Sequence, residues 1–263
     1  MKIQVLMENT CEVPGLLAEH GLSLYLETQG KKLLFDMGQS DAFAQNAQTM
    51  GVDLSAVDFA VLSHGHYDHG GGLYRFLELN HTAPVYVNRH AFEEHWHGTV
   101  RDIGLDPALA AHPQIVQVDQ AMTLAAGIEL IPAEGCPSPY GLDSAGLTMR
   151  QQGELVAEDF RHEQYLLLQE QGKTVVLSGC SHRGILNIQT WFQPDILVGG
   201  FHLAGNDPAG EGRQRLEQTA EILMQFPTRY WTCHCTGRKQ YQFLKQKMVD
   251  QLGYLATGQT LVL

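Results

Sequence analysis

A short segment of the chain carries four side chains that can bind metal ions. His64, His66, Asp68 and His69 fall within six residues and follow directly after the apolar run at residues 59–63. Residues two apart in an extended chain face the same side, so His64 and His66 can share one position, while Asp68 and His69 can point at a second one. Imidazoles with a carboxylate are ligands that zinc, iron and manganese accept. We interpret the segment as a metal site with two positions rather than as a histidine-rich surface turn.

The pattern His-Xaa-His-Xaa-Asp-His after a strand, with Asp36 closing an earlier strand, resembles the metallo-β-lactamase superfamily. The likeness runs from residue 2 almost to residue 263. Three later segments are similar to the subgroup that includes the archaeal dihydropterin-ribofuranosylaminobenzene phosphate synthase: GCSH at 179–182, GGFHL at 199–203 and HCTG at 234–237. The resemblance implies an α/β fold, an αβ/βα sandwich of two packed mixed β-sheets flanked by helices, with a two-metal cleft along one edge.

The resemblance also implies a ligand set for two divalent ions. His64 and His66 would bind the first ion, and Asp68 and His69 the second, with His234 as the last ligand of the second ion. Asp68 would in addition accept a hydrogen bond from the nucleophilic water. Zn²⁺ is the ion that we expect, with Mn²⁺, Fe²⁺ and Mg²⁺ as alternatives.

Two positions depart from the pattern of the superfamily. Many relatives take the third ligand of the first ion from a Pro-Gly-His-Thr loop, where this chain has PAEGCP at residues 132–137. We expect His182, which follows the strand at 174–178, to replace that ligand. Relatives also carry a metal-bridging Asp after a strand and a glycine, where this chain has Cys180. Because His182 already supplies a ligand, we expect Cys180 to stand beside the metals; if it bridges them instead, Glu134 is the nearest remaining candidate ligand.

Asp36, His202, Arg238 and Lys239 complete the residues that we expect at the site. The Asp36 carboxylate is predicted to accept a hydrogen bond and orient the ligand loop rather than to bind metal. Arg238 and Lys239 begin a predicted helix beside His234, where they either hold a phosphate or carboxylate of the substrate or are simply solvated. His202 has three open interpretations, as metal ligand, substrate donor or structural histidine, and we group it with the substrate-binding residues.

Histidines at strand ends also have ordinary structural roles. His182 could be satisfied by the backbone beside a helix start, and His234 could be a core histidine. Cys233 and Cys235 could form a structural zinc site with His234. Alternation along a strand points both thiols away from that histidine, and no further cysteine pair is present to complete such a site.

Hydrophobic periodicity predicts the elements that position these groups. Strands gather early in the chain and alternate with helices late, which favours one domain over residues 1–263 in which helices cover packed sheets. Residues 135–159 are expected to form a loop or lid. The predicted strands are 22–27, 33–36, 59–63, 84–88, 115–118, 128–131, 165–169, 174–178, 195–198, 229–232 and 260–263, and the predicted helices are 40–50, 73–79, 184–192, 211–225 and 237–251.

Composition limits the classes of partner. Seventeen Lys and Arg against 29 Asp and Glu give a formal charge of −12, so we expect neither nucleic acid nor a membrane surface as partner. No run approaches 18 apolar residues, Glu8 interrupts the N-terminal apolar stretch too soon for a signal peptide, and an odd number of cysteines favours free thiols. These features predict a cytoplasmic protein that acts on a small molecule, and they leave its oligomeric state open.

Hydrolysis is the chemistry that this ligand set favours. Two divalent ions would lower the pKa of bound water toward about 7 and would stabilise charge on an attacked carbonyl or phosphoryl oxygen. A small, anionic ester or phosphate is the expected substrate. The subgroup resemblance implies a transferase as alternative, joining a dihydropterin diphosphate to an aminobenzene ribofuranosyl phosphate. A non-catalytic metal-binding module is disfavoured because six ligands exceed the need of a structural site. A di-iron, oxygen-reducing role is disfavoured because it normally needs a carboxylate bridge and a flavin partner.

Overall fold

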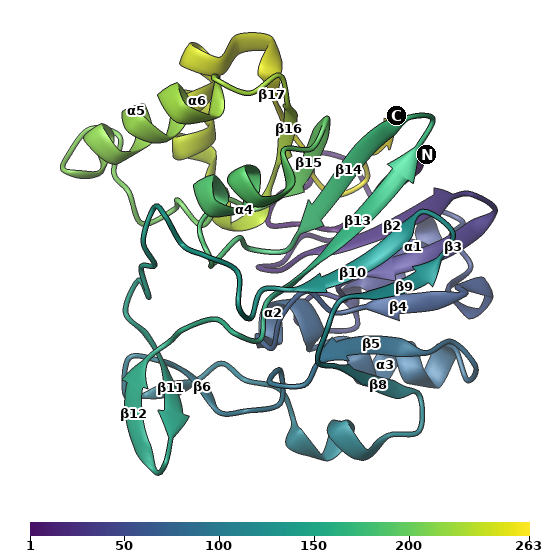
Figure 1. Ribbon diagram of the computed structural model, residues 1–263. Helices are drawn as coiled ribbons and strands as arrows, with labels where there is room; N and C mark the ends of the chain where they lie inside the picture. The colour runs from purple at the N-terminus through teal and green to yellow at the C-terminus, as the bar shows by residue number, and fades with distance from the viewer.

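The computed structural model describes residues 1–263 and consists of two seven-stranded β-sheets packed face to face, with helices on both outer faces (Figure 1). The predicted αβ/βα sandwich of two mixed sheets is confirmed. The first and last strands pair in the first sheet, so the chain termini lie side by side, with the amino group of Met1 3.2 Å from the carbonyl oxygen of Leu263.

The first sheet is antiparallel at one side and parallel at the other. From β3 onward each strand runs parallel to its neighbour. In spatial order its strands are β18 (Thr260–Val262), β1 (Lys2–Met7), β2 (Ser23–Thr28), β3 (Lys31–Phe35), β4 (Phe59–Val61), β5 (Val85–Asn88) and β8 (Ile115–Val118).

The second sheet has the same mixed character. Its first four strands are parallel and the rest antiparallel. In spatial order its strands are β17 (Leu252–Tyr254), β16 (Arg229–Thr232), β15 (Ile196–Gly199), β14 (Lys173–Ser178), β13 (Gln164–Glu170), β10 (Ile128–Pro132) and β9 (Met122–Ala125).

Helices cover the outer faces of both sheets. Helices α1 (Ala42–Thr49) and α3 (Leu73–Leu79) pack on the first sheet, and α4 (Ile185–Phe192), α5 (Gly212–Leu223) and α6 (Arg238–Met248) pack on the second. The remaining helical segments are single turns. They are α2 (Tyr67–Gly70) and the 3₁₀ turns η1 (Leu54–Ala56), η2 (Pro107–Ala111), η3 (His234–Thr236) and η4 (Val249–Gln251). No helix of the structure combines the length and the apolar character needed to cross a membrane.

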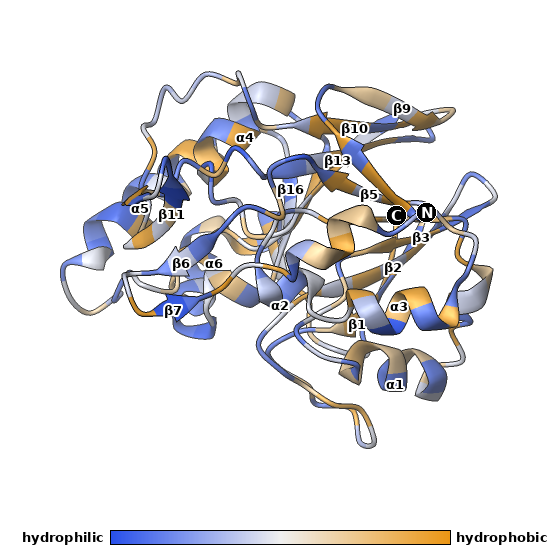
Figure 2. Ribbon diagram, turned by 90° about the horizontal axis from the view of Figure 1, so that it is seen from below, coloured by the Kyte–Doolittle hydropathy of each residue, from blue (hydrophilic) through white to orange (hydrophobic).

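The central core lies between the two sheets. Leu24 and Phe35 of the first sheet and Leu166 and Leu177 of the second belong to one cluster of fully buried side chains. Strands β5, β10 and β13 are correspondingly coloured as hydrophobic in Figure 2, whereas β6, β7 and β11 are mostly hydrophilic. Removal of this apolar surface from water holds the two sheets together.

The stretch at residues 135–159 differs from the predicted loop. It contains a hairpin of β11 (Leu147–Gln151) and β12 (Glu154–Ala157), which joins β6 (His95–His97) and β7 (Arg101–Asp102) in a third, four-stranded sheet. This small sheet lies outside the sandwich (Figure 1). That residues 135–159 act as a lid remains a prediction. The other predicted elements are present within a few residues of their expected ends, whereas the strands β1, β6, β7, β9 and β17 were not predicted.

Candidate metal centre

The predicted site residues lie at the carboxyl ends of parallel strands. Asp36 follows β3 and His64 follows β4 in the first sheet, and Cys180, His202 and His234 follow β14, β15 and β16 in the second. Carboxyl ends of neighbouring parallel strands meet at one edge of a sheet. The two sheets therefore bring segments that are far apart in the sequence to a common site.

Backbone strain concentrates at these strand ends. Asp36, Ser181, His202 and His234 have φ values of 60°, 57°, 51° and 48°, in the left-handed region that favours glycine. Each such residue costs on the order of 1 kcal/mol or more, and this strain clusters at functional sites where surrounding contacts enforce it. At each of these ends the chain turns sharply, which places the following side chains along the edge.

The first ligand group consists of His64, His66 and His182, whose ligand atoms lie within 4.8 Å of one another. The rings pack edge to face with centroids 4.7 to 4.8 Å apart. His64 Nε2, His66 Nε2 and both nitrogens of His182 are buried and have no hydrogen-bond partner. Burial lowers the pKa of all three histidines well below the ordinary value, so the rings are neutral and can offer lone pairs. Three neutral imidazoles that meet at one point, without hydrogen bonds from their ring nitrogens to one another, fit a metal ion.

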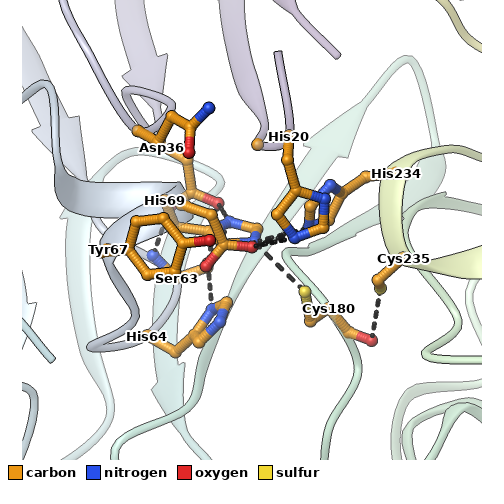
Figure 3. A network of polar contacts seen from close by, with 12 residues as sticks. His20, Asp36, Ser63, His64, Tyr67, His69, Cys180, His234 and Cys235 are labelled. Carbon is orange, nitrogen blue, oxygen red and sulfur yellow. Dashed lines mark hydrogen bonds and ion pairs between the residues drawn. The ribbon is translucent and has the colours of Figure 1, made fainter. Parts of the chain in front are cut away.

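The second ligand group consists of Asp68, His69, Cys180 and His234, again within 4.8 Å of one another. Figure 3 shows how His69, Cys180 and His234 of this group point toward one another. His69 Nε2 lies 3.1 Å from Cys180 Sγ and 3.2 Å from His234 Nε2. Asp68 Oδ2 lies 3.2 Å from His234 Nε2. Ligand atoms from three separate segments thus converge on one point, and the donor set of imidazole, carboxylate and thiol fits a divalent cation.

Opposite charges compensate one another in the second ligand group. Burial lowers the pKa of His69, but the Asp36 and Asp68 carboxylates outweigh burial and raise that pKa above its ordinary value. Burial raises the pKa of Asp68, yet His69, His20 and His234 outweigh it and hold the pKa well below the ordinary value. For Cys180, burial and the neighbouring Cys235 raise the pKa of the thiol well above its usual range. A divalent cation can take the place of these protons.

Asp36 fixes the orientation of two ligand histidines. Its Oδ2 lies 2.7 Å from His69 Nδ1 and accepts a 2.7 Å hydrogen bond from Ser63 Oγ, which lies 2.8 Å from His64 Nδ1. Because an ionised carboxylate only accepts, His69 and Ser63 donate to it, and Ser63 Oγ is then left to accept from His64 Nδ1–H. The Nε2 atoms of both histidines therefore face their ligand groups, in the manner of carboxylate–histidine–metal triads. Asp36 thus lies where the sequence predicted it, outside the ligand atoms.

Asn9 orients the third histidine in the same way, since its Oδ1 lies 2.7 Å from His234 Nδ1. Sequence reasoning missed both Ser63 and Asn9. Neither residue type is a usual metal ligand, and the only available signal was that Ser63 directly precedes the histidine motif.

Gly179 permits the close approach of two strand ends. A Cβ atom at this position would lie 2.1 Å from Ser63 Oγ and 3.2 Å from Asp36 Oδ2. Only glycine therefore lets the end of β14 pack against the residues that orient His64 and His69.

A cavity of about 750 Å³ opens beside both ligand groups. Its lining includes His66, Asp68, Cys180, His182 and His234, and also His202 and the cations Arg101 and Arg215. A neighbouring cavity of about 650 Å³ shares His182, His202 and Arg215 with it. The ligand groups are therefore accessible from a space large enough for a small organic molecule.

Comparison with known proteins agrees with this geometry. The family model of the metallo-beta-lactamase superfamily matches residues 17–146, which include the His64–His69 motif. The crystal structure of Tm1679, a metal-dependent hydrolase of the beta-lactamase superfamily, is 27% identical, covers 100% of this chain and 99% of its own, and superposes with a TM-score of 0.85. The chain belongs to the metallo-beta-lactamase superfamily.

Two curated relatives from Methanocaldococcus jannaschii also match this superfamily member over most of their length. An uncharacterized protein is 27% identical over 258 residues, covering 93% of this chain and 94% of its own. The 7,8-dihydropterin-6-methyl-4-(beta-D-ribofuranosyl)-aminobenzene-5'-phosphate synthase is 24% identical over 279 residues, covering 92% of this chain and 89% of its own.

The structure brings most of the predicted site residues together, but not Arg238 and Lys239. Both are exposed at the start of α6 and line neither cavity. Arg238 instead lies 4.7 Å above the ring of Tyr254. The cations that line the main cavity are Arg101 and Arg215, which sequence reasoning missed because they lie outside any recognisable motif.

Cys180 is the other residue whose position differs from the expected one. Instead of standing beside the metal site, its Sγ lies among the atoms of the second ligand group. Cys233 is buried in the core between the sheets, and Cys235 Sγ faces the Cys180 carbonyl oxygen at 3.4 Å. Neither of these two thiols shares a ligand group with His234.

Proposed function

We propose that this superfamily member is a hydrolase that uses two divalent metal ions. The observation that carries the proposal is the pair of adjacent, buried ligand groups that open into one cavity. His64, His66 and His182 would hold one ion, and Asp68, His69 and His234 the other. Such ions supply Lewis-acid polarisation of the substrate and lower the pKa of a coordinated water toward about 7.

Cys180 joins the second ligand group in this proposal. Its Sγ is as near to His69 Nε2 as His234 Nε2 is, at 3.1 Å against 3.2 Å. A thiolate ligand favours zinc over magnesium, because soft sulfur suits Zn²⁺ and hard oxygen suits Mg²⁺. We therefore propose zinc as the ion of the second group.

Asp68 is the residue of the chain best placed to orient the attacking water. Its carboxylate lines the cavity, is ionised and lies between the side chains of His20 and His234, each 3.2 Å from Oδ2. His202 faces the same cavity. Burial lowers the pKa of His202 to about 4, so that its neutral ring can form a hydrogen bond with the substrate or the leaving group near pH 7.

The cavity favours an anionic ester or phosphate despite the acidic surface of the chain. Arg101 lines it, donates a 2.8 Å hydrogen bond to the Tyr67 hydroxyl and lies over the Tyr67 ring, and it forms no ion pair with a carboxylate. Arg215 is different, since it is paired with Asp143 at 2.6 Å. Arg101 is therefore the uncompensated cation that would attract a substrate anion.

A second candidate function is carbon–nitrogen bond formation on a dihydropterin diphosphate. It is supported by the 24% identity to the archaeal synthase over most of both chains. The same ligand groups would then assist departure of diphosphate, and no water would be consumed.

Both candidates can be tested with one set of assays. The metal-free chain is reloaded with Zn²⁺ and offered phosphodiesters, thioesters, lactones, and a dihydropterin diphosphate with and without the aminobenzene ribofuranosyl phosphate. We expect metal-dependent hydrolysis that falls by at least about 10²-fold in Asp68→Asn, the scale for loss of a positioned acid–base group. Asp58→Asn, an exposed carboxylate near the other end of β4, serves as the matched control and should leave the rate unchanged. Turnover only when both synthase substrates are present would identify the transferase instead.

A further inference from the structure

Two histidines of the first ligand group, His66 and His182, lack the polar partner that orients the other ligand histidines. His64, His69 and His234 each place one ring nitrogen 2.7 to 2.8 Å from an oxygen of Ser63, Asp36 or Asn9. His66 has no such contact, and its Nε2 is buried without a partner. Metal-ligating histidines almost always donate their second ring N–H to a carboxylate, a carbonyl or water, so a partner for His66 is expected nearby.

A buried carboxylate and two further histidines lie near His66. His95, Glu158 and His162, which we name the Glu158 cluster, offer ligand atoms within 4.8 Å of one another and of an atom of His66. Glu158 Oε2 lies 2.9 Å from His95 Nδ1, and Glu158 Oε1 lies 3.7 Å from His162 Nε2. Glu158 Oε1 is itself buried without a hydrogen-bond partner. Three atoms without a hydrogen-bond partner, His66 Nε2, Glu158 Oε1 and His162 Nε2, thus belong to residues of the same buried group.

Hydrogen bonding excludes the Glu158 cluster as a four-ligand metal site. The Gly65 backbone N–H donates a 2.8 Å hydrogen bond to His162 Nδ1. A ring nitrogen that accepts a hydrogen bond carries no proton, so the proton of His162 is on Nε2, and this nitrogen has no lone pair to offer a metal. His162 Nε2–H lies 3.7 Å from Glu158 Oε1, too far for a hydrogen bond, whereas His95 Nδ1 donates to Oε2 at 2.9 Å. His95 therefore holds the carboxylate in place.

We propose that Glu158 is the positioning residue of His66 in the first ligand group. On binding of an ion its carboxylate would accept the Nε2–H of His66, a hydrogen bond that this structure does not contain, and would so fix the tautomer in which Nδ1 is free to bind a metal ion at the cavity. This inference rests on the proposed metal centre and adds to it a carboxylate partner for the first ligand group, as Asp36 is for the second.

The third sheet positions Glu158 and its neighbours beside the first ligand group. His95 begins β6, and Glu158 directly follows β12, so pairing of β6 with β11 and of β11 with β12 brings both residues to His66. Phe160, two residues further on, stacks on the ring of His182 at a centroid distance of 4.5 Å. One segment outside the sandwich therefore supports two of the three histidines in the first ligand group.

The first test measures metal affinity. The full-length wild-type chain, Glu158→Gln and the exposed control Glu154→Gln of β12 are freed of metal and titrated with Zn²⁺ against a chromophoric chelator. The wild type is expected to bind two ions, and Glu158→Gln to bind one of them about 10- to 100-fold more weakly, the range found when outer partners of metal ligands are removed. The weakened ion should be the one that His66→Ala loses. Glu154→Gln should match the wild type.

Each outcome of this titration decides a different claim. Failure of the wild type to bind two ions overturns the proposed metal centre itself. Two ions with unchanged affinity in Glu158→Gln overturn only the role of Glu158. A third ion in the wild type that Glu158→Gln loses would show that the Glu158 cluster is a metal site after all, and would also contradict the positioning role.

The second test needs no variant at position 158, so it holds even if Glu158→Gln does not fold. Long-range ¹H–¹⁵N spectra of the zinc-loaded, histidine-labelled wild type report which nitrogen of each ring carries the proton. The signal that His66→Ala removes is expected to show a protonated Nε2 and an unprotonated Nδ1. A protonated Nδ1 on this ring, or a metal-bound Nε2, would overturn the inference.

Discussion

Replacement of Asp36 by Asn tests the coupling between this carboxylate and both ligand groups. The Asp36 side chain is fully buried and accepts from three donors, with Oδ1 taking the Ser63 backbone N–H at 2.7 Å and Oδ2 taking Ser63 Oγ and His69 Nδ1. An asparagine offers one oxygen and one NH₂. Whichever way the amide is turned, its NH₂ group faces a donor that the carboxylate had satisfied.

The size of the effect follows from these contacts. One buried donor left unsatisfied costs about 1 to 3 kcal/mol, so Asp36→Asn should lower the free energy of unfolding of the metal-free chain by that amount. His69 can relieve the clash only by moving its proton to Nε2, which occupies the nitrogen that faces the second ligand group. Zinc affinity at that group should therefore fall about 10- to 100-fold, or about 1.4 to 2.7 kcal/mol.

Two assays and two companion variants measure this prediction. Urea unfolding of the metal-free chain gives the stability, and chelator competition gives the affinity for each ion. Ser63→Ala removes the link to His64 but leaves His69 on Asp36, so it should weaken the first ion and spare the second. Asp119→Asn changes an exposed carboxylate outside the site and should alter neither quantity. Wild-type affinity for both ions in Asp36→Asn would refute the reasoning.

Three further outcomes follow from the same geometry. Cys180→Ser should bind the second ion at least about tenfold more weakly, because a serine hydroxyl stays protonated near pH 7, whereas a bound metal deprotonates a thiol. Unchanged affinity in chelator competition would show that Cys180 is not a metal ligand. Gly179→Ala should lower the free energy of unfolding by about 1 to 3 kcal/mol, because its Cβ would clash with Ser63. Gly205→Ala is the control, since a Cβ at that position meets nothing within 4 Å. Equal stability of the two variants would disprove the close approach of Gly179 to Ser63. The metal-free chain should lose stability as pH falls below about 6.5, because burial lowers the pKa of the three histidines in the first ligand group, so that below this pH the unfolded chain binds protons that the folded chain does not. Each histidine then lowers the free energy of unfolding by up to about 1.4 kcal/mol per pH unit. Equal midpoints of urea unfolding at pH 7.5 and pH 5.5 would contradict this.

The parts of the site that could be predicted are those with local spacing. His64, His66, Asp68 and His69 follow one another after a buried strand, and the structure divides them between the two ligand groups as the resemblance implied. His182 likewise lies in the first group. These residues lie near strand ends, so the prediction of the strands already placed them along one edge.

Cys180 and His182 illustrate where local reasoning ends. The presence of one ligand at position 182 suggested that position 180 need not supply another. The left-handed backbone of Ser181, with φ of 57°, turns the chain between the two, so that each side chain reaches a different ligand group. Such a turn is set by packing against the neighbouring strand ends and has no signature in residue type.

The third sheet was missed for a different reason. Leu147 and Met149 are buried and alternate with exposed or half-buried residues, and Gln152-Gly153 forms a turn with positive φ at both positions, so the hairpin signal was present. The surrounding prolines and glycines favoured a loop instead. Glu158 and His95 lie far apart in the sequence and only the pairing of β6 with β11 relates them, so no spacing pointed to their cluster with His66.

For Arg238 and Lys239, the local sequence suggested an anion-binding site, but packing of the helix places both side chains outside the cavity. Basic residues in the first turn beside His234 suggested an anion site. The first turn of α6 faces outward, and Arg238 lies on the Tyr254 ring, away from the cavity. Tertiary contacts of the helix decided which way its N-terminal residues point.

Metal dependence of hydrolysis tests the central claim most directly. The metal-free chain is titrated with Zn²⁺, and the initial rate is followed on the substrate that the loaded chain hydrolyses fastest in the set of assays proposed above. Two ligand groups that act together predict a rate that saturates at two ions per chain and an oxygen atom from ¹⁸O-labelled water in the product. Saturation at one ion per chain, a rate independent of metal, or a product without the label would contradict the two-metal hydrolase.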